Sequence, residues 1–278
     1  MAKEQLNKGK ALKVKSRNPI IDFDKLKLYF REPYEIDLDG CDGKITLVQP
    51  SIGDIVNLGE KRFYSTLNVF VTNTTAFRLQ LWEQGYDWNE LSDYELFTMI
   101  IGTAEKDIYS TFLPDLDFSK FGIFQRHIPD SEKGVTVLYN PEDKIEINEQ
   151  VYYHISQYLR TVFNIHPEEK ITNDRIMKKW FIEKDKREIK NRESKKNKDN
   201  EDSGLLPIIS GCVNHPGFKY KTSELKEIGV YQFYDSVKRL QIYESTTALQ
   251  KGMYSGFVDT KGINSENFNF MRPIQASD

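Results

Sequence analysis

Hydrophobic and polar positions near the start of the chain first follow the period of strands and then that of helices. Two alternating runs, residues 34–38 and 44–48, flank a turn rich in glycine and aspartate, which predicts a β-hairpin. Ser51 and Asp54 then form a capping-box pattern at the start of a helix over residues 51–71. Apolar residues at helical spacing predict one core-facing stripe on this helix: Ile52, Ile55, Val56, Phe63, Leu67 and Phe70.

Helical patterning continues over the next segments. Residues 75–84 predict a shorter helix that ends at Gly85, and Ser92 with Glu95 forms a second capping box. The apolar face of the helix that begins there is best interpreted as core, and it consists of Leu96, Phe97, Ile100, Ile101 and Ile108.

Strand-like patterning returns in residues 121–147, as three short runs separated by turns. Asn148 is the predicted N-cap of the amphipathic helix that follows. His154 lies beside its apolar stripe without a second histidine or a cysteine four residues away, which favours a structural role over metal binding. The stripe comprises Val151, Ile155, Tyr158, Leu159 and Val162.

The composition changes after Pro167. A helical start has Ile176, Trp180 and Ile182 as its few apolar anchors, and a mixed-charge tract follows from about residue 183 to residue 203. Because both signs of charge alternate there, the tract is typical of a solvated helix extension or a hinge. We interpret it as the boundary between two folded units.

A folded pattern resumes at residue 205. Thr222 or Ser223 is the predicted cap of a short helix, and a long helix is predicted from Val230 to about Lys251, ending at Gly252 and Gly256. One face of the long helix carries Val230, Phe233, Tyr234, Val237, Leu240 and Ala248.

These segments predict a predominantly helical α+β protein, with a small antiparallel β element in the N-terminal part and a helical C-terminal unit. We expect a disordered basic arm over residues 1–19 and an α+β domain over residues 20–165. A charged helix or linker over residues 166–204 and a helical C-terminal domain over residues 205–278 complete the predicted organisation.

Composition narrows the classes of function. The chain has 278 residues and a formal charge of −3, which argues against a surface adapted as a whole to nucleic acid. Its N-terminus lacks the apolar region of a secretory signal, and its apolar runs are too short to span a bilayer. Plentiful aromatic residues, with 17 Phe and 15 Tyr, supply potential anchors for protein interfaces.

The sequence contains no established catalytic or cofactor motif. It lacks a Walker A loop, a dinucleotide fingerprint, a nucleophile elbow and a kinase signature. The turn with Asp37, Asp39 and Asp42 lacks the glycine and the distal glutamate of a calcium-binding EF-hand loop. Cys212 and His215 could form a nucleophilic pair, but apolar neighbours would raise the thiol pKa. We therefore predict no catalytic, cofactor-binding or metal-binding residues.

Two parts of the chain resemble a group of bacteriophage proteins. Residues 45–70 with 81–102, and residues 205–264, are similar to segments of structural or assembly proteins from tailed phages of Gram-positive bacteria. The resemblance implies a non-enzymatic role through protein–protein contacts, as a tail assembly chaperone or as a baseplate or other tail component. It implies tail-tube, tape-measure or baseplate proteins as partners and a place in the host cytoplasm during assembly or in the virion. Self-association is possible, nucleic acid is disfavoured as a partner, and the short apolar runs argue against a membrane.

The candidate partner-binding residues lie on the predicted long helix: Phe233, Tyr234, Val237 and Leu240. Aromatic anchors on such a face could bind an apolar surface of a partner, although for any single residue burial in the internal core is favoured. Two other functions stay open. One is a nucleic-acid-binding protein that uses the basic arm and Lys184–Lys198, and the other is an enzyme of unrecognised type.

Overall fold

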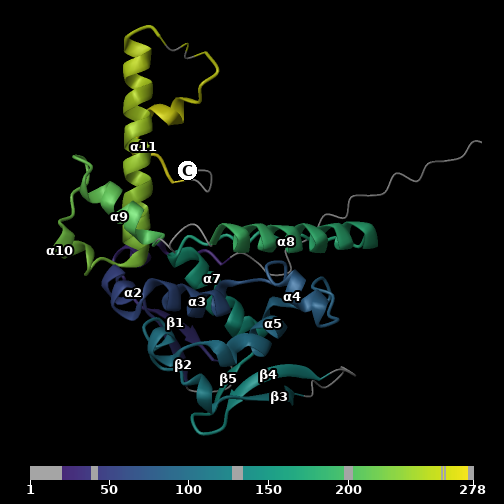
Figure 1. Ribbon diagram of the computed structural model, residues 1–278. Helices are drawn as coiled ribbons and strands as arrows, with labels where there is room; N and C mark the ends of the chain where they lie inside the picture. The colour runs from purple at the N-terminus through teal and green to yellow at the C-terminus, as the bar shows by residue number, and fades with distance from the viewer. Residues whose placement is uncertain are drawn as a thin grey trace, which may run out of the picture.

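The computed structural model describes residues 21–38, 43–126, 134–196, 203–257, 259 and 261–274. It confirms the mainly helical α+β fold with small antiparallel sheets. Figure 1 shows a body of packed helices and sheets from which two long helices project, α8 (Arg175–Lys196) to one side and α11 (Val230–Tyr254) upward. The predicted basic arm lies outside the described residues, as do Asp39, Cys41, Asp42 and His127.

The predicted hairpin is confirmed. Helix α1 (Lys25–Tyr29) precedes it, and β1 (Tyr34–Asp37) pairs antiparallel with β2 (Lys44–Leu47). Ile36 lies opposite Ile45, and both side chains are buried in the main core. Alternation along the strands therefore directs their apolar residues inward.

The helix predicted over residues 51–71 is in fact two helices, α2 (Ile52–Leu58) and α3 (Glu60–Val71). The Ser51–Asp54 capping box is present as predicted. The single-helix prediction is wrong because Gly59 has a φ of 91°, a left-handed conformation that glycine tolerates and that ends the helical path. Val56 is consequently exposed rather than part of the buried stripe.

Two further helices follow. The shorter helix is α4 (Arg78–Glu83), which ends before Gly85, and the second capping box begins α5 (Asp93–Ile100). The predicted continuous face after residue 92 is wrong, because η1 (Ile101–Thr103) and α6 (Lys106–Tyr109) interrupt it, and η2 (Phe118–Lys120) follows. Leu96, Phe97 and Ile108 are nevertheless buried as expected.

The second sheet confirms the predicted β segment. It has the order β3 (Gly122–Arg126), β4 (Val135–Asn140) and β5 (Ile145–Ile147), all antiparallel. Asn148 caps α7 (Glu149–Val162), whose predicted apolar stripe is buried at the centre of the main core. The Tyr94 hydroxyl joins α5 to the sheet, since it donates to the Ile147 carbonyl and accepts from the Leu138 N–H at 3.0 Å.

The first part of α8 packs against α4 through a second apolar cluster that contains Ile182. The Arg78 guanidinium forms a mostly buried ion pair with Asp185, whose Oδ1 lies 2.5 Å from Nη2. Of the three predicted apolar anchors only Ile182 is buried. Ile176 is 76% exposed and Trp180 is also exposed, because they lie on the face of α8 turned away from α4.

The C-terminal part consists of α9 (Leu205–Val213), α10 (Thr222–Leu225), α11 and η3 (Ser265–Phe268). Thr222 and Ser223 lie inside α10 and do not cap it; the Lys221 N–H instead donates to Glu224 Oε2 at 2.8 Å. Gly252 lies inside α11, and the helix ends before Gly256. Ala248 is exposed and does not share the buried face.

Residues 50–53 and 226–230 form a backbone junction, here called the α2–α11 joint. The N–H groups of Ile52 and Gly53 donate to the carbonyls of Ile228 (3.1 Å) and Lys226 (2.9 Å). The Val230 N–H donates to the Pro50 carbonyl at 3.2 Å. The first N–H groups of α2 thus find partners that a helix cannot supply itself.

Replacing Gly53 by alanine should weaken this joint. A Cβ at this position would lie 2.7 Å from the Lys226 carbonyl oxygen, so the backbone would have to shift. We expect Gly53→Ala to lower the free energy of unfolding by about 1–3 kcal/mol, as overpacking usually does, measured by urea denaturation. Gly211→Ala in α9 is the matched control, because a Cβ there meets no atom within 4 Å. Equal stability of Gly53→Ala and wild type would contradict the steric argument.

Candidate functional site

The structure separates the predicted partner-binding residues by burial. Phe233 is fully buried, and Tyr234 and Val237 are half-buried against the main core. The Tyr234 hydroxyl lies 3.1 Å from that of Tyr64 in α3. Leu240 is half-buried beside the turn at Gly217. The first part of this face therefore attaches α11 to the body, whereas Tyr243 and Tyr254 further along the helix are exposed.

Two grooves run along α11. One, of about 500 Å³, lies between α1, the end of α7 and α11. The other, of about 700 Å³, lies between α11, the turn at residues 217–220 and Phe270 with Met271. Tyr29, Asp235 and Arg239 line both grooves, so these side chains form the wall that separates them.

The segment after α11 returns along the helix, as Figure 1 shows. Side chains of α11 hold it by its carbonyl oxygens. Arg239 Nη1 donates to the carbonyls of Phe270 (2.9 Å) and Arg272 (2.8 Å), and Gln250 Nε2 donates to that of Phe268 (3.0 Å). These hydrogen bonds hold the returning segment by its main chain. Its side chains are therefore not needed for this attachment, and those of Phe270 and Met271 are exposed.

Apolar side chains of α11 and the returning segment form an exposed surface, here called the α11 surface. Its exposed members are Tyr243, Tyr254, Phe257, Phe270 and Met271, and the half-buried Leu240 lies at its edge. Met271 is 72% exposed and Phe257 is 91% exposed, whereas Tyr243 and Phe270 pack edge to face with ring centroids 5.7 Å apart. Sequence reasoning missed Tyr243, although its position three residues after Leu240 places it on a neighbouring part of the same helix.

Asp235 occupies the wall between the grooves. Burial raises the pKa of its carboxyl group, while the positive charges of Arg239 and Lys238 act in the opposite direction. Burial also raises the pKa of Tyr234, so this hydroxyl stays protonated and can donate a hydrogen bond.

Cys212 and His215 have a structural role rather than a catalytic one. The His215 N–H donates to the Cys212 carbonyl at 3.0 Å, and burial raises the pKa of the Cys212 thiol, which opposes nucleophilic activation. His215 Nδ1 accepts the Gly217 N–H at 3.0 Å, and Nε2 faces Glu244 Oε1 at 3.3 Å. His215 therefore connects the turn after α9 to the side of α11.

The remaining candidates for metal binding are dispersed. In the described part of the chain, no three histidine, cysteine, aspartate or glutamate residues gather in a way that could hold a metal ion. His154 contacts the Tyr34 hydroxyl through Nδ1 at 3.0 Å, and burial lowers the pKa of its imidazole. No helix among the described residues has the length and apolar character that crossing a bilayer requires.

Comparison with known protein families gives a match over the C-terminal region, which contains the α11 surface. Residues 195–275 match the YomV second domain. This family is phage-associated, and the match is consistent with a phage protein. No curated protein and no solved structure matches the chain. The YomV-matched region contains α9, α10, α11 and η3. It overlaps the C-terminal domain predicted over residues 205–278, and the division of the chain into domains stays a prediction.

Asp235→Asn tests the electrostatics of the groove wall. Because burial raises the pKa of Asp235 in the folded protein, the folded state binds the proton more tightly than the unfolded chain does. The charge therefore destabilises the fold at neutral pH, and this cost disappears below about pH 4, where both states are protonated. We expect Asp235→Asn to raise the free energy of unfolding at neutral pH and to leave it unchanged in acid.

Urea denaturation at both pH values measures this effect, with Asp22→Asn as the control at an exposed position. An Asp235→Asn variant that is less stable than wild type at neutral pH would mean that attraction to Arg239 and Lys238 outweighs burial.

Proposed function

We propose that the chain is a non-enzymatic phage protein that acts through protein–protein contacts in tail assembly, as an assembly chaperone or as a tail or baseplate component. The phage association of the YomV-matched region supports the first part of this proposal. The resemblance of residues 45–70, 81–102 and 205–264 to tail proteins supports the second.

The exposure of the α11 surface is the observation that carries the proposal. Tyr243, Phe270 and Met271 line a groove of about 700 Å³, and Tyr254 and Phe257 are exposed at the far end of the helix. Covering apolar area stabilises a complex by about 25 cal/mol per Å² before the costs of association. Tyrosine is also among the residue types that dominate binding energy.

The occupant we propose for the α11 surface is an apolar segment of another tail protein. Arg239, Thr246 and Gln250 of α11 already donate hydrogen bonds to carbonyls of the chain's own returning segment. A partner would therefore contact mainly the apolar side chains of that segment and of α11. The projection of α11 from the body leaves room for a partner to approach it (Figure 1).

Substitutions on the α11 surface should weaken association with a tail protein. We expect the double variant Tyr243→Ala/Met271→Ala to lose at least about tenfold in affinity, because truncating anchors of an interface commonly costs more than 1 kcal/mol each. The measurement is co-expression with tail-tube, tape-measure and baseplate proteins, pull-down, and titration of the captured complex by calorimetry.

Ile123→Ala on β3 is the matched control, since Ile123 is an exposed apolar residue on the opposite part of the body. Failure of the wild-type chain to associate with any tail protein would contradict the proposed function. Association that survives the double variant but not Ile123→Ala would assign the contact to a different surface.

A further inference from the structure

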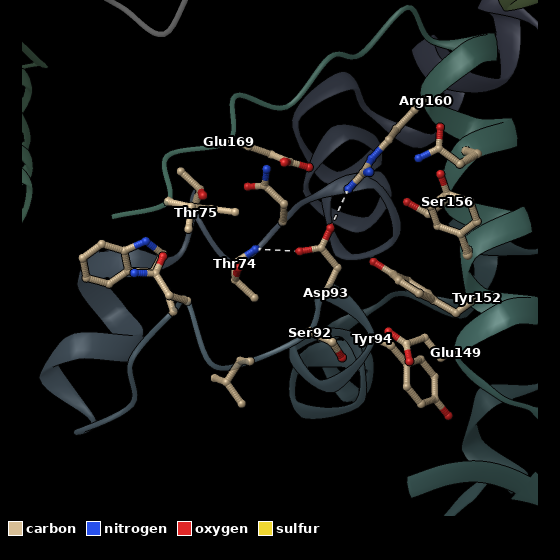
Figure 2. Close-up of a pocket in the computed structure, with 17 residues that line it drawn as sticks. Thr74, Thr75, Ser92, Asp93, Tyr94, Glu149, Tyr152, Ser156, Arg160 and Glu169 are labelled. Carbon is tan, nitrogen blue, oxygen red and sulfur yellow. Dashed lines mark hydrogen bonds and ion pairs between the residues drawn. The ribbon is translucent and has the colours of Figure 1, made fainter. Parts of the chain in front are cut away.

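A polar pocket lies in the body beside α7, and two of its lining residues, Tyr94 and Tyr152, also belong to the main core. Its volume is about 140 Å³, and it is enclosed by α7, by the loop that contains Thr74 and by the beginning of α5. Figure 2 shows Asp93 near its centre, Arg160 and Tyr152 of α7 on one side, and Thr74 on the other. No part of the α11 surface contributes to it.

Two buried hydroxyl groups in this pocket lack a hydrogen bond of good geometry. Ser156 is 1% exposed and Tyr152 is 3% exposed, and the two hydroxyls interact with each other, but neither makes a hydrogen bond of good geometry. Figure 2 shows the Tyr152 ring directing its hydroxyl toward Asp93. Buried polar groups are nearly always paired in folded proteins, so two hydroxyls without such a bond beside one pocket indicate that a ligand completes them.

The charges of the pocket favour a cation. The Arg160 guanidinium already donates hydrogen bonds to the main chain. Its Nε donates to the Val71 carbonyl at 2.8 Å, and its Nη2 donates to the Thr72 carbonyl at 2.7 Å. Its contact to Asp93 Oδ2 is longer, at 3.4 Å. Asp93 Oδ1 accepts the Thr74 N–H at 3.0 Å, which leaves most of the acceptor capacity of Oδ2 open.

Two more carboxylates extend the negative charge toward solvent. Glu149 and Glu169 are exposed, and Figure 2 places them on different sides of Asp93. The lining thus carries three carboxylates against one guanidinium, which disfavours an anion. A metal ion is also disfavoured, because these carboxylates do not converge as a metal-binding group among the described residues.

We propose that this pocket binds an ammonium or guanidinium group at the end of a short alkyl chain. The cation would donate hydrogen bonds to Asp93 Oδ2 and to the Ser156 and Tyr152 hydroxyls, with Glu149 and Glu169 attracting it at the entrance. The volume suits such a group, because a cavity of about 150 Å³ accommodates benzene. The same chemistry could come from a free small amine or from a lysine or arginine side chain of a partner protein.

Calorimetric titration of the full chain tests this proposal. The probes are butylammonium, ethylguanidinium and a neutral-ended tripeptide with a central arginine, and butyrate and sodium chloride are the controls for alkyl chain and ionic strength. We expect saturable binding of at least one cationic probe at millimolar concentration and none of butyrate. Binding of the small cations alone indicates that the natural ligand is a free amine or guanidine. Binding of the peptide indicates that it is a lysine or arginine side chain of a partner protein, and both outcomes support a cation site.

Asp93→Asn should weaken that binding by at least about tenfold, because it removes a charge-assisted hydrogen bond while keeping an acceptor for the Thr74 N–H. Ser156→Ala should weaken it by a smaller factor. Glu90→Gln is the matched control, since it removes the same charge from an exposed position outside the pocket. Absence of saturable binding to all three cationic probes, or equal loss in Asp93→Asn and Glu90→Gln, would overturn the proposal.

Discussion

Three backbone hydrogen bonds at the α2–α11 joint fix where the C-terminal helices leave the body. Each contributes only about 0.5–1.5 kcal/mol net, but together with the Ser51 capping box they satisfy every free N–H at the start of α2. Arg31 reinforces the joint, because its guanidinium donates to the carbonyls of Gln49 and Glu227, each at 2.9 Å. Since Val230 begins α11 within this joint, the joint also sets the direction of the helix.

Because α11 is fixed at one end, the same helix can contribute to the core and still present exposed side chains, which we propose bind a partner. Phe233 completes the main core close to the joint, whereas Tyr243 and the residues beyond it extend away from the body. Helix α8 is attached in a comparable way, through Ile182 and the Arg78–Asp185 pair near its beginning. The polar pocket beside α7 is built into the body, so the two binding sites that we propose lie on separate parts of the chain.

Local sequence patterns predict the helices and strands better than they predict which segments pack against each of them. The capping boxes at Ser51 and Ser92 were recognisable because they depend on residues three positions apart. The break at Gly59 was missed because helical periodicity continues across one glycine. Periodicity also identified the face that includes Phe233, but exposure depends on which segment covers it. The return of residues 265–274 along α11, which creates the groove beside Tyr243, involves contacts that no local pattern encodes. The pocket around Asp93 likewise joins four segments, which contain Thr74, Asp93, Tyr152 and Glu169.

Site-specific photo-crosslinking can show whether the α11 surface contacts a tail protein during assembly. A benzophenone amino acid replaces Tyr243 in one variant and Ile123 on β3 in another, and both are irradiated during phage assembly in host cells. Mass spectrometry then identifies the crosslinked proteins. We expect a tail protein to be crosslinked from position 243 and not from position 123. Crosslinks from position 243 only to proteins unrelated to the tail, or none at all, would contradict this expectation.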